Sequence, residues 1–139
     1  MRRKPPPHLP LRRTLLAALL AAACGATQAA EVYVIANAEL ELTPEEVKEI
    51  FLGEVQFAGT LKLQPIDNAG AQGEFLARVL KMSGTKYQGA WTKKAFRDGL
   101  NAPPVKATDA EVLSFVRSNP GAIGYVSTAP SGVRIVGRF

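Results

Sequence analysis

The chain has 139 residues, with 17 basic and 12 acidic side chains and a formal net charge of +5. Five of the basic residues lie within the first 13 positions, and from residue 30 onward the chain holds 12 basic and 12 acidic residues. Such a balanced segment gives no reason to expect nucleic-acid binding, which depends on clustered Lys and Arg. The only His and the only Cys are His8 and Cys24. Residues 30–139 therefore cannot form a Ser-His-Asp triad or a Cys/His zinc site, and we expect no enzyme, metal or cofactor.

The N-terminus has the layout of a secretory signal peptide. The basic stretch "MRRKPPPHLPLRR" precedes the apolar run "TLLAALLAAACGA" and the small residues of "TQAA". The apolar run is shorter than the roughly 20 residues that span a membrane. Thr27 and Ala29 predict cleavage after Ala29, so that residues 1–29 form the signal and residues 30–139 form one periplasmic domain. The alternative is lipoprotein processing at Cys24, although "AAAC" lacks the usual Leu three residues before the Cys.

A strand and a helix are the first elements expected in this domain. The apolar, β-branched run over 32–37 predicts a strand that starts the fold. A helix is predicted over 43–54, with Thr43 as its N-cap, Pro44 in its first position and Glu46 completing a capping box. Gly53 is the expected C-terminal stop of this helix.

The rest of the chain continues to alternate between strand and helix patterns. Residues 61–66 alternate apolar and polar side chains and predict a second strand. The paired prolines within 100–107 predict a loop. Further helices and strands are expected in the order helix 74–83, helix 87–96, helix 108–119, strand 122–127 and strand 133–139. This alternation predicts an α/β layer with helices packed on a small sheet.

The helix over 87–96 offers both a core face and a surface. Tyr87, Trp91 and Ala95 recur every four residues, which predicts that they pack into the core; a stacking platform for a ligand is the alternative. Basic side chains lie on the other faces of this helix: Lys93, Lys94 and Arg97. They form either a solvated helix end or a surface that docks an envelope or membrane protein partner.

Several stretches in fixed order resemble a known family. They are "TPEEVKEIFLGEVQFAGTLKLQPI", then Phe75, then "YQGAWTKKAFRDG" and "VRSNPGAIGYV". Together they resemble the periplasmic phosphate-binding proteins of ABC transporters, and in particular short, single-lobe relatives, from Val32 to Val126. The resemblance implies a single lobe of a type II periplasmic-binding-protein-like fold, with a small mixed sheet and packed helices.

The loop that would hold phosphate departs from the family pattern. Full-length relatives close two lobes on the ligand, and their loop carries an Arg followed by a Ser-Gly-Thr run. The corresponding stretch here is "DNAGAQGEF", residues 67–75, with Asp67 or Asn68 in place of the Arg and no hydroxyl group. Asp67 and Glu74 would repel a dianion, whereas the glycines and the start of a helix remain. Either the stretch is an inherited turn without a tight ligand, or it is an altered ligand site that uses Asn68 and Gln72.

The candidate ligand-binding residues lie on this loop and at two strand ends. Backbone N–H groups near a helix N-terminus attract anions, and open α/β sheets bind ligands at the carboxyl ends of their strands. On these grounds the candidates are Asn37, Asn68, Gly70, Gln72, Gly73 and Tyr125, each with a purely structural role as the alternative. The function expected from the resemblance is an exported, substrate-binding-like domain that binds a small polar or anionic solute weakly or with a partner. The alternative is an envelope interaction or scaffold protein built on the same lobe.

Overall fold

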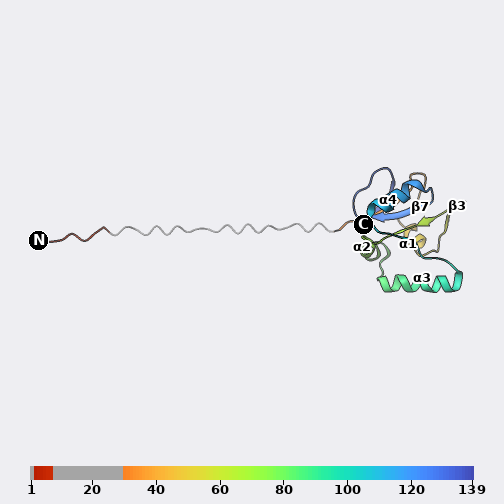
Figure 1. The fold of residues 1–139 in the computed structure, drawn as a ribbon, viewed down its shortest axis with the longest axis horizontal. Helices are drawn as coiled ribbons and strands as arrows, with labels where there is room; N and C mark the ends of the chain where they lie inside the picture. The colour runs from red at the N-terminus through yellow and green to blue at the C-terminus, as the bar shows by residue number, and fades with distance from the viewer. Residues whose placement is uncertain (1, 8–29) are drawn as a thin grey trace.

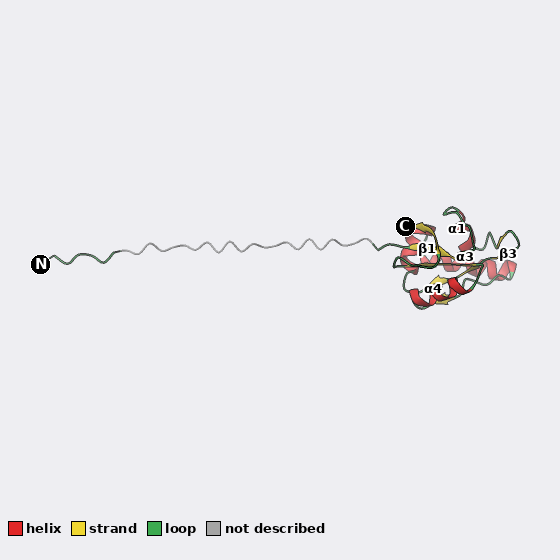
Figure 2. Cartoon of the chain, turned by 90° about the horizontal axis from the view of Figure 1, so that it is seen from above, coloured by secondary structure: helices red, strands yellow, loops and turns green. Residues whose placement is uncertain are grey.

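A computed structural model describes residues 2–7 and 30–139 (Figures 1 and 2). The apolar part of the expected export signal and Cys24 lie outside the described residues, so cleavage after Ala29 stays a prediction. In the part of the chain that is described, no helix has the length and apolarity that crossing a membrane requires.

A four-stranded mixed sheet forms the centre of the domain. Its strands lie in the order β4-β7-β1-β8, with β1 antiparallel to both of its neighbours and β4 parallel to β7. The bounds are β1 (Tyr33–Ala36), β4 (Gln64–Pro65), β7 (Ala122–Val126) and β8 (Arg134–Arg138). The strands predicted over 32–37, 122–127 and 133–139 are thus confirmed, as is a mixed sheet with packed helices.

The strand predicted over 61–66 is divided between two sheets, so the expectation of one strand is wrong. Its first part, β3 (Leu61–Lys62), pairs with β2 (Phe57–Ala58) in a separate hairpin, and only its second part joins the central sheet as β4. The chain changes from one sheet to the other at Leu63. The Leu63 N–H donates to the Gln56 carbonyl oxygen, and the Gln64 N–H donates to the Gly121 carbonyl oxygen. Pro65 is tolerated because β4 is an edge strand.

Helix α1 (Glu46–Phe51) begins later than its sequence pattern predicts. The carboxylate of Glu46 accepts a hydrogen bond from the Thr43 N–H at 2.8 Å, which is half of the expected capping box. The Thr43 side chain makes no cap hydrogen bond, and Thr43 and Pro44 belong to the turn before the helix. The predicted stop is confirmed, since Gly53 has a φ of 73°.

The helix predicted over 74–83 consists of α2 (Gln72–Phe75) and a π-helical turn, η1 (Leu76–Leu80). The helix predicted over 87–96 is longer, as α3 (Gly84–Asp98), and Gly99 ends it with a φ of 67°. The last helix, α4 (Asp109–Ser118), has Thr108 as its N-cap, because the Thr108 hydroxyl accepts from the Glu111 N–H. The loop over 100–107 contains β6 (Val105–Lys106), which pairs in parallel with β5 (Asp67–Asn68).

The sheet separates two apolar clusters. Alternate residues of β1 enter different clusters, with Val34 on one side and Ile35 on the other. Helix α4 covers the Ile35 side, and α1, α2, η1 and α3 belong to the Val34 side, so that α4 and α3 lie on opposite sides of β7 in Figure 1. Gly124 of β7 allows the close approach of α4, because a Cβ there would lie 2.8 Å from Val112 Cγ1.

Helix α3 is anchored only through its first half. Tyr87 and Trp91 are buried, which confirms them as core residues, and the Trp91 Nε1 donates to the Phe51 carbonyl oxygen at 3.1 Å. Ala95 is exposed, so its predicted place in the core is wrong. A 15-residue helix is about 22 Å long, and its last turns extend past the apolar face it packs on. The prediction that Lys94 lies on another face of the helix than Trp91 is also wrong, because the Lys94 Nζ lies 6.0 Å from the Trp91 ring centroid.

Candidate functional site

Strand β5 holds Asp67 and Asn68, the two residues that the resemblance to the phosphate-binding family puts in place of an Arg. Asp67 is only 2% exposed and accepts hydrogen bonds from the hydroxyls of Tyr87 and Tyr125, each at 2.8 Å. Burial raises the pKa of Asp67, and the two tyrosine hydrogen bonds partly oppose that rise. Burial also raises the pKa of both tyrosines, as does the nearby Asp67 charge. This position therefore holds a buried hydrogen-bond acceptor, whose two oxygens are already bonded to tyrosine hydroxyls, and it offers no donor to an anion.

An aromatic cluster supports this carboxylate from the core side. The rings of Phe75 and Tyr125 are stacked, with centroids 3.8 Å apart and an interplanar angle of 6°. Phe51 meets Phe75 edge-on, with centroids 4.7 Å apart. These contacts link the end of α2 to α1 and β7, and they fix the direction of the Tyr125 hydroxyl.

Asn68 is also buried, and its amide is used within the domain. Its Nδ2 donates to Asp109 Oδ1 at 2.7 Å and to the Tyr125 carbonyl oxygen at 3.0 Å. Its Oδ1 accepts from the Gly70 N–H at 3.0 Å. Both donors and one acceptor of the side chain are thus satisfied without a ligand.

Asp109, the first residue of α4, collects the donors around this loop. Its Oδ2 accepts from the Ser127 N–H at 3.1 Å, the Ser127 hydroxyl at 2.7 Å and the Thr128 hydroxyl at 3.3 Å, in addition to the Asn68 amide on Oδ1. Partial burial would raise the pKa of Asp109, but these hydrogen bonds outweigh it and the pKa is lowered. The Asp109 carboxylate therefore already accepts hydrogen bonds from four donors that could otherwise bind an anion.

The sequence reasoning missed Asp109 as a site residue. An acid just after an N-cap is explained by the helix dipole alone, so its position gives no functional signal. Its partners lie 18, 19 and 41 residues away. Only the convergence of β5, α4 and the segment after β7 brings them together.

The glycine loop itself retains few free donors. The N–H groups of Ala69, Gly70 and Ala71 bond to the Lys106 carbonyl oxygen, the Asn68 side chain and the Asn68 carbonyl oxygen. The first helical hydrogen bond runs from the Phe75 N–H to the Ala71 carbonyl oxygen at 3.0 Å. The N–H groups of residues 72–74 therefore have no partner in the preceding turn, and Gly73 is exposed while Gln72 is half-buried.

The predicted site residues fall into two places. Asn68, Gly70, Gln72, Gly73 and Tyr125 lie together around β5 and the start of α2. Asn37 lies at the other end of α4, where its Nδ2 donates to the carbonyl oxygens of Val116 and Arg117. The structure therefore brings Asn37 to no common site with the other five, and ligand binding by any of the six stays a prediction.

The partner residues predicted on α3 differ from one another in their surroundings. Lys93 is exposed, Lys94 lies against Trp91, and Arg97 forms a two-pronged ion pair with Asp98 at 2.9 and 3.0 Å. Between them, Phe96 is 96% exposed. Among residues 2–7 and 30–139, no group of three or more His, Cys, Asp or Glu side chains could hold a metal ion.

Comparison with known proteins places the fold. No family model matches the chain, and no curated protein matches it. Among solved structures, a protein of Clostridium perfringens described as a phosphate ABC transporter substrate-binding protein with bound phosphate matches with a TM-score of 0.55 and 15% identity. That match covers 77% of this chain and 45% of the other.

Two further structures give weaker matches. PstS from Borrelia burgdorferi has a TM-score of 0.46 at 16% identity, covering 70% of this chain and 41% of its own. An ABC-type phosphate transport receptor from Vibrio cholerae has a TM-score of 0.48 at 16% identity, covering 77% and 46%. The chain thus spans less than half the length of the structures it matches. At these identities the first match shows a shared fold, which confirms the expected fold class.

Proposed function

We propose that this chain is an exported, phosphate-transporter-type substrate-binding-like domain that binds a small polar or anionic solute weakly or with a partner. The observation that supports weak binding is the arrangement at Asp109, where the domain's own carboxylate takes the hydroxyl, amide and backbone donors near the loop. A solute at the loop would meet mainly the first-turn N–H groups of α2. It would also meet the exposed carboxylate of Glu74.

A titration of residues 30–139 with inorganic phosphate tests this proposal. We expect calorimetry to show no binding with a Kd of about 1 μM or tighter, which would correspond to roughly −8 kcal/mol. Because Ser127 and Thr128 lie on the Asp109 carboxylate, the Asp109→Ala variant serves as the comparison that removes the competing charge. Submicromolar binding by the unmodified domain would show that the Asp109 cluster does not limit the site.

The second candidate is an envelope interaction or scaffold protein, and the exposed end of α3 favours it. Phe96 is almost fully exposed next to Arg97, and Lys93 lies one helical turn before it. An apolar ring with flanking positive charge suits a partner surface that combines an apolar pocket with carboxylates. Such a partner would be an envelope or membrane protein if the chain is exported as predicted.

A photo-crosslinking amino acid at position 96, in the full chain expressed in a Gram-negative host, tests the second candidate. We expect one discrete adduct, which disappears when Lys93→Glu is introduced. The same crosslinker at Phe57, which is 55% exposed on the β2–β3 hairpin, is the matched control and should give no such adduct. Equal adducts from both positions would mean that α3 is not a specific contact surface.

A further inference from the structure

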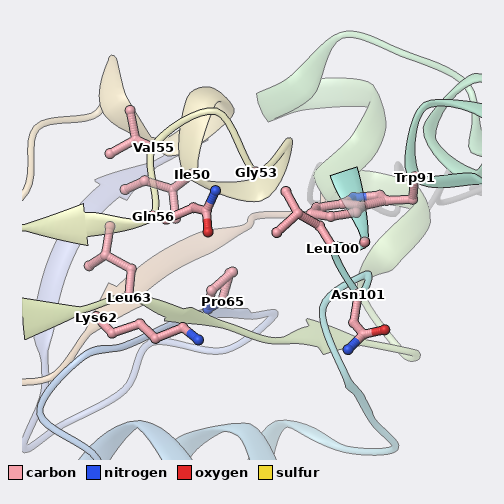
Figure 3. Close-up of a pocket in the computed structure, with 11 residues that line it drawn as sticks. Ile50, Gly53, Val55, Gln56, Lys62, Leu63, Pro65, Trp91, Leu100 and Asn101 are labelled. Atoms are coloured by element: carbon pink, nitrogen blue, oxygen red, sulfur yellow. The ribbon is translucent and has the colours of Figure 1, made fainter. Parts of the chain in front are cut away.

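A cavity separate from the loop lies between α1, the β2–β3 hairpin and the end of α3 (Figure 3). Its volume is about 260 Å³ and one side opens to solvent. Its lining includes six apolar side chains, those of Ile50, Val55, Leu63, Pro65, Trp91 and Leu100. The hairpin β2–β3 lies outside the central sheet, which the chain enters again only at Gln64.

Three polar side chains also line this cavity. Gln56 and Lys62 extend toward the gap from one side and Asn101 faces it from the other, and all three residues are exposed (Figure 3). Lys62 is the only ionisable side chain that lines the cavity. Within the described part of the chain, no salt bridge engages Lys62. The cavity therefore combines apolar side chains and polar groups with a single positive charge, that of Lys62.

We propose that this cavity binds a small apolar monocarboxylate. The apolar body would lie between the Trp91 indole, Leu100 and Leu63, and the carboxylate would face the Lys62 ammonium group, with Gln56 or Asn101 donating a hydrogen bond. The geometry suits one negative charge, since a second carboxylate would meet no other cation in the lining. This site goes beyond the proposed function, because it shares no residue with the loop over 67–75.

The volume sets the size of the ligand. A closed apolar cavity of about 150 Å³ holds a benzene molecule, and sites for drug-sized ligands begin at roughly 300 Å³. The space of about 260 Å³ therefore suits a single ring or branched chain with a short carboxylate arm. Phenylacetate is a probe of this size and charge.

The chain reports on this cavity directly, because Trp91 is its only tryptophan. We expect phenylacetate to change the Trp91 fluorescence of residues 30–139 saturably, with a Kd on the order of 1 mM or tighter. The neutral isostere phenylacetamide should bind about fivefold more weakly, since an exposed ion pair contributes up to about 1 kcal/mol. Amide NMR signals of Leu100 and Asn101 should shift on titration, while that of Gly73 should not.

Matched lysine variants separate the ion pair from a general loss of charge. Lys62→Gln should weaken phenylacetate binding about fivefold and leave phenylacetamide binding unchanged. Lys93→Gln removes the same charge from an exposed site that does not line the cavity, and it should change neither. The proposal is overturned if fluorescence shows no saturation at about ten times the expected Kd, or if both ligands bind equally. It is also overturned if, of the three amide signals, only that of Gly73 responds to phenylacetate. A parallel titration with inorganic phosphate tests the loop over 67–75 separately, so that failure of one site can be told from failure of the other.

Discussion

Trp91→Ala should lower the free energy of unfolding of residues 30–139 by about 3–5 kcal/mol, the usual cost of truncating a buried aromatic side chain. Trp91 is only 7% exposed, and the ring lies directly over the end of α1, where a Cβ on Gly53 would approach its Cη2 to 2.7 Å. The substitution also leaves the Phe51 carbonyl oxygen without its 3.1 Å hydrogen bond from the indole. A domain of this size has about 5–15 kcal/mol in total, so the loss should be large.

Equilibrium denaturation in urea measures this loss, with two further variants for comparison. Trp91→Phe keeps an aromatic ring but removes the donor to Phe51, and it should fall between the parent protein and Trp91→Ala. Lys93→Ala, on the exposed face of the same helix, should change stability by less than about 0.5 kcal/mol. If Trp91→Ala unfolds at the same urea concentration as the parent protein, the ring is not part of the core and α3 is held by other contacts.

Local patterns in the sequence predicted the elements that depend on local physics. The Glu46 carboxylate accepts from the Thr43 N–H and Gly53 ends α1 with a φ of 73°, as the neighbouring residues predict. The i, i+4 spacing of Tyr87 and Trp91 was also sufficient to identify the buried face of α3. The same periodicity failed at Ala95, because it carries no information on where the apolar surface that receives the helix ends.

Pairing between distant segments could not be predicted in the same way. The alternation over 61–66 is correct for an extended chain, but it does not tell which sheet each residue joins. That choice depends on the Gln56 and Gly121 carbonyl oxygens, which accept from the N–H groups of Leu63 and Gln64. Gly121 must lack a side chain here, since a Cβ would lie 2.1 Å from the Lys62 carbonyl oxygen.

At the candidate site too, local patterns were predictable from the sequence and contacts between distant residues were not. The sequence correctly marks a turn and the start of a helix within residues 67–75, and it shows the missing Arg, Ser and Thr. It does not show that Asn68 bonds to Asp109, 41 residues away, or that Asp67 receives Tyr125, 58 residues away. Polar residues in a glycine-rich turn therefore suggested ligand donors, whereas the folded chain uses them to join β5 to α4 and β7.

Asp67→Ala should be the second strongly destabilising substitution. It would leave the hydroxyls of Tyr87 and Tyr125 without their acceptor while both side chains remain buried. An unsatisfied buried polar group costs about 1–3 kcal/mol, so we expect a loss of roughly 2–6 kcal/mol, reduced by relief of the buried charge. Glu74→Ala, an acid of the same loop that is exposed and paired only with Arg78, is the control and should cost less than about 0.5 kcal/mol.

The pH dependence of stability separates the buried charge of Asp67 from its hydrogen bonds. Burial raises the folded-state pKa of Asp67 above the ordinary value of 3.8, so the folded state holds its proton to a higher pH than the unfolded state does. The stability contributed by this residue is then fully present below pH 3.8 and is lost as the pH rises through the raised pKa. Asp67→Asn keeps an acceptor for one tyrosine and cannot ionise. The free energy of unfolding of the parent protein, relative to that of the Asp67→Asn variant, should therefore fall as the pH rises from about 4. A constant difference would mean that the tyrosine hydrogen bonds balance the burial penalty, and a difference that grows as the pH rises would mean that they outweigh it.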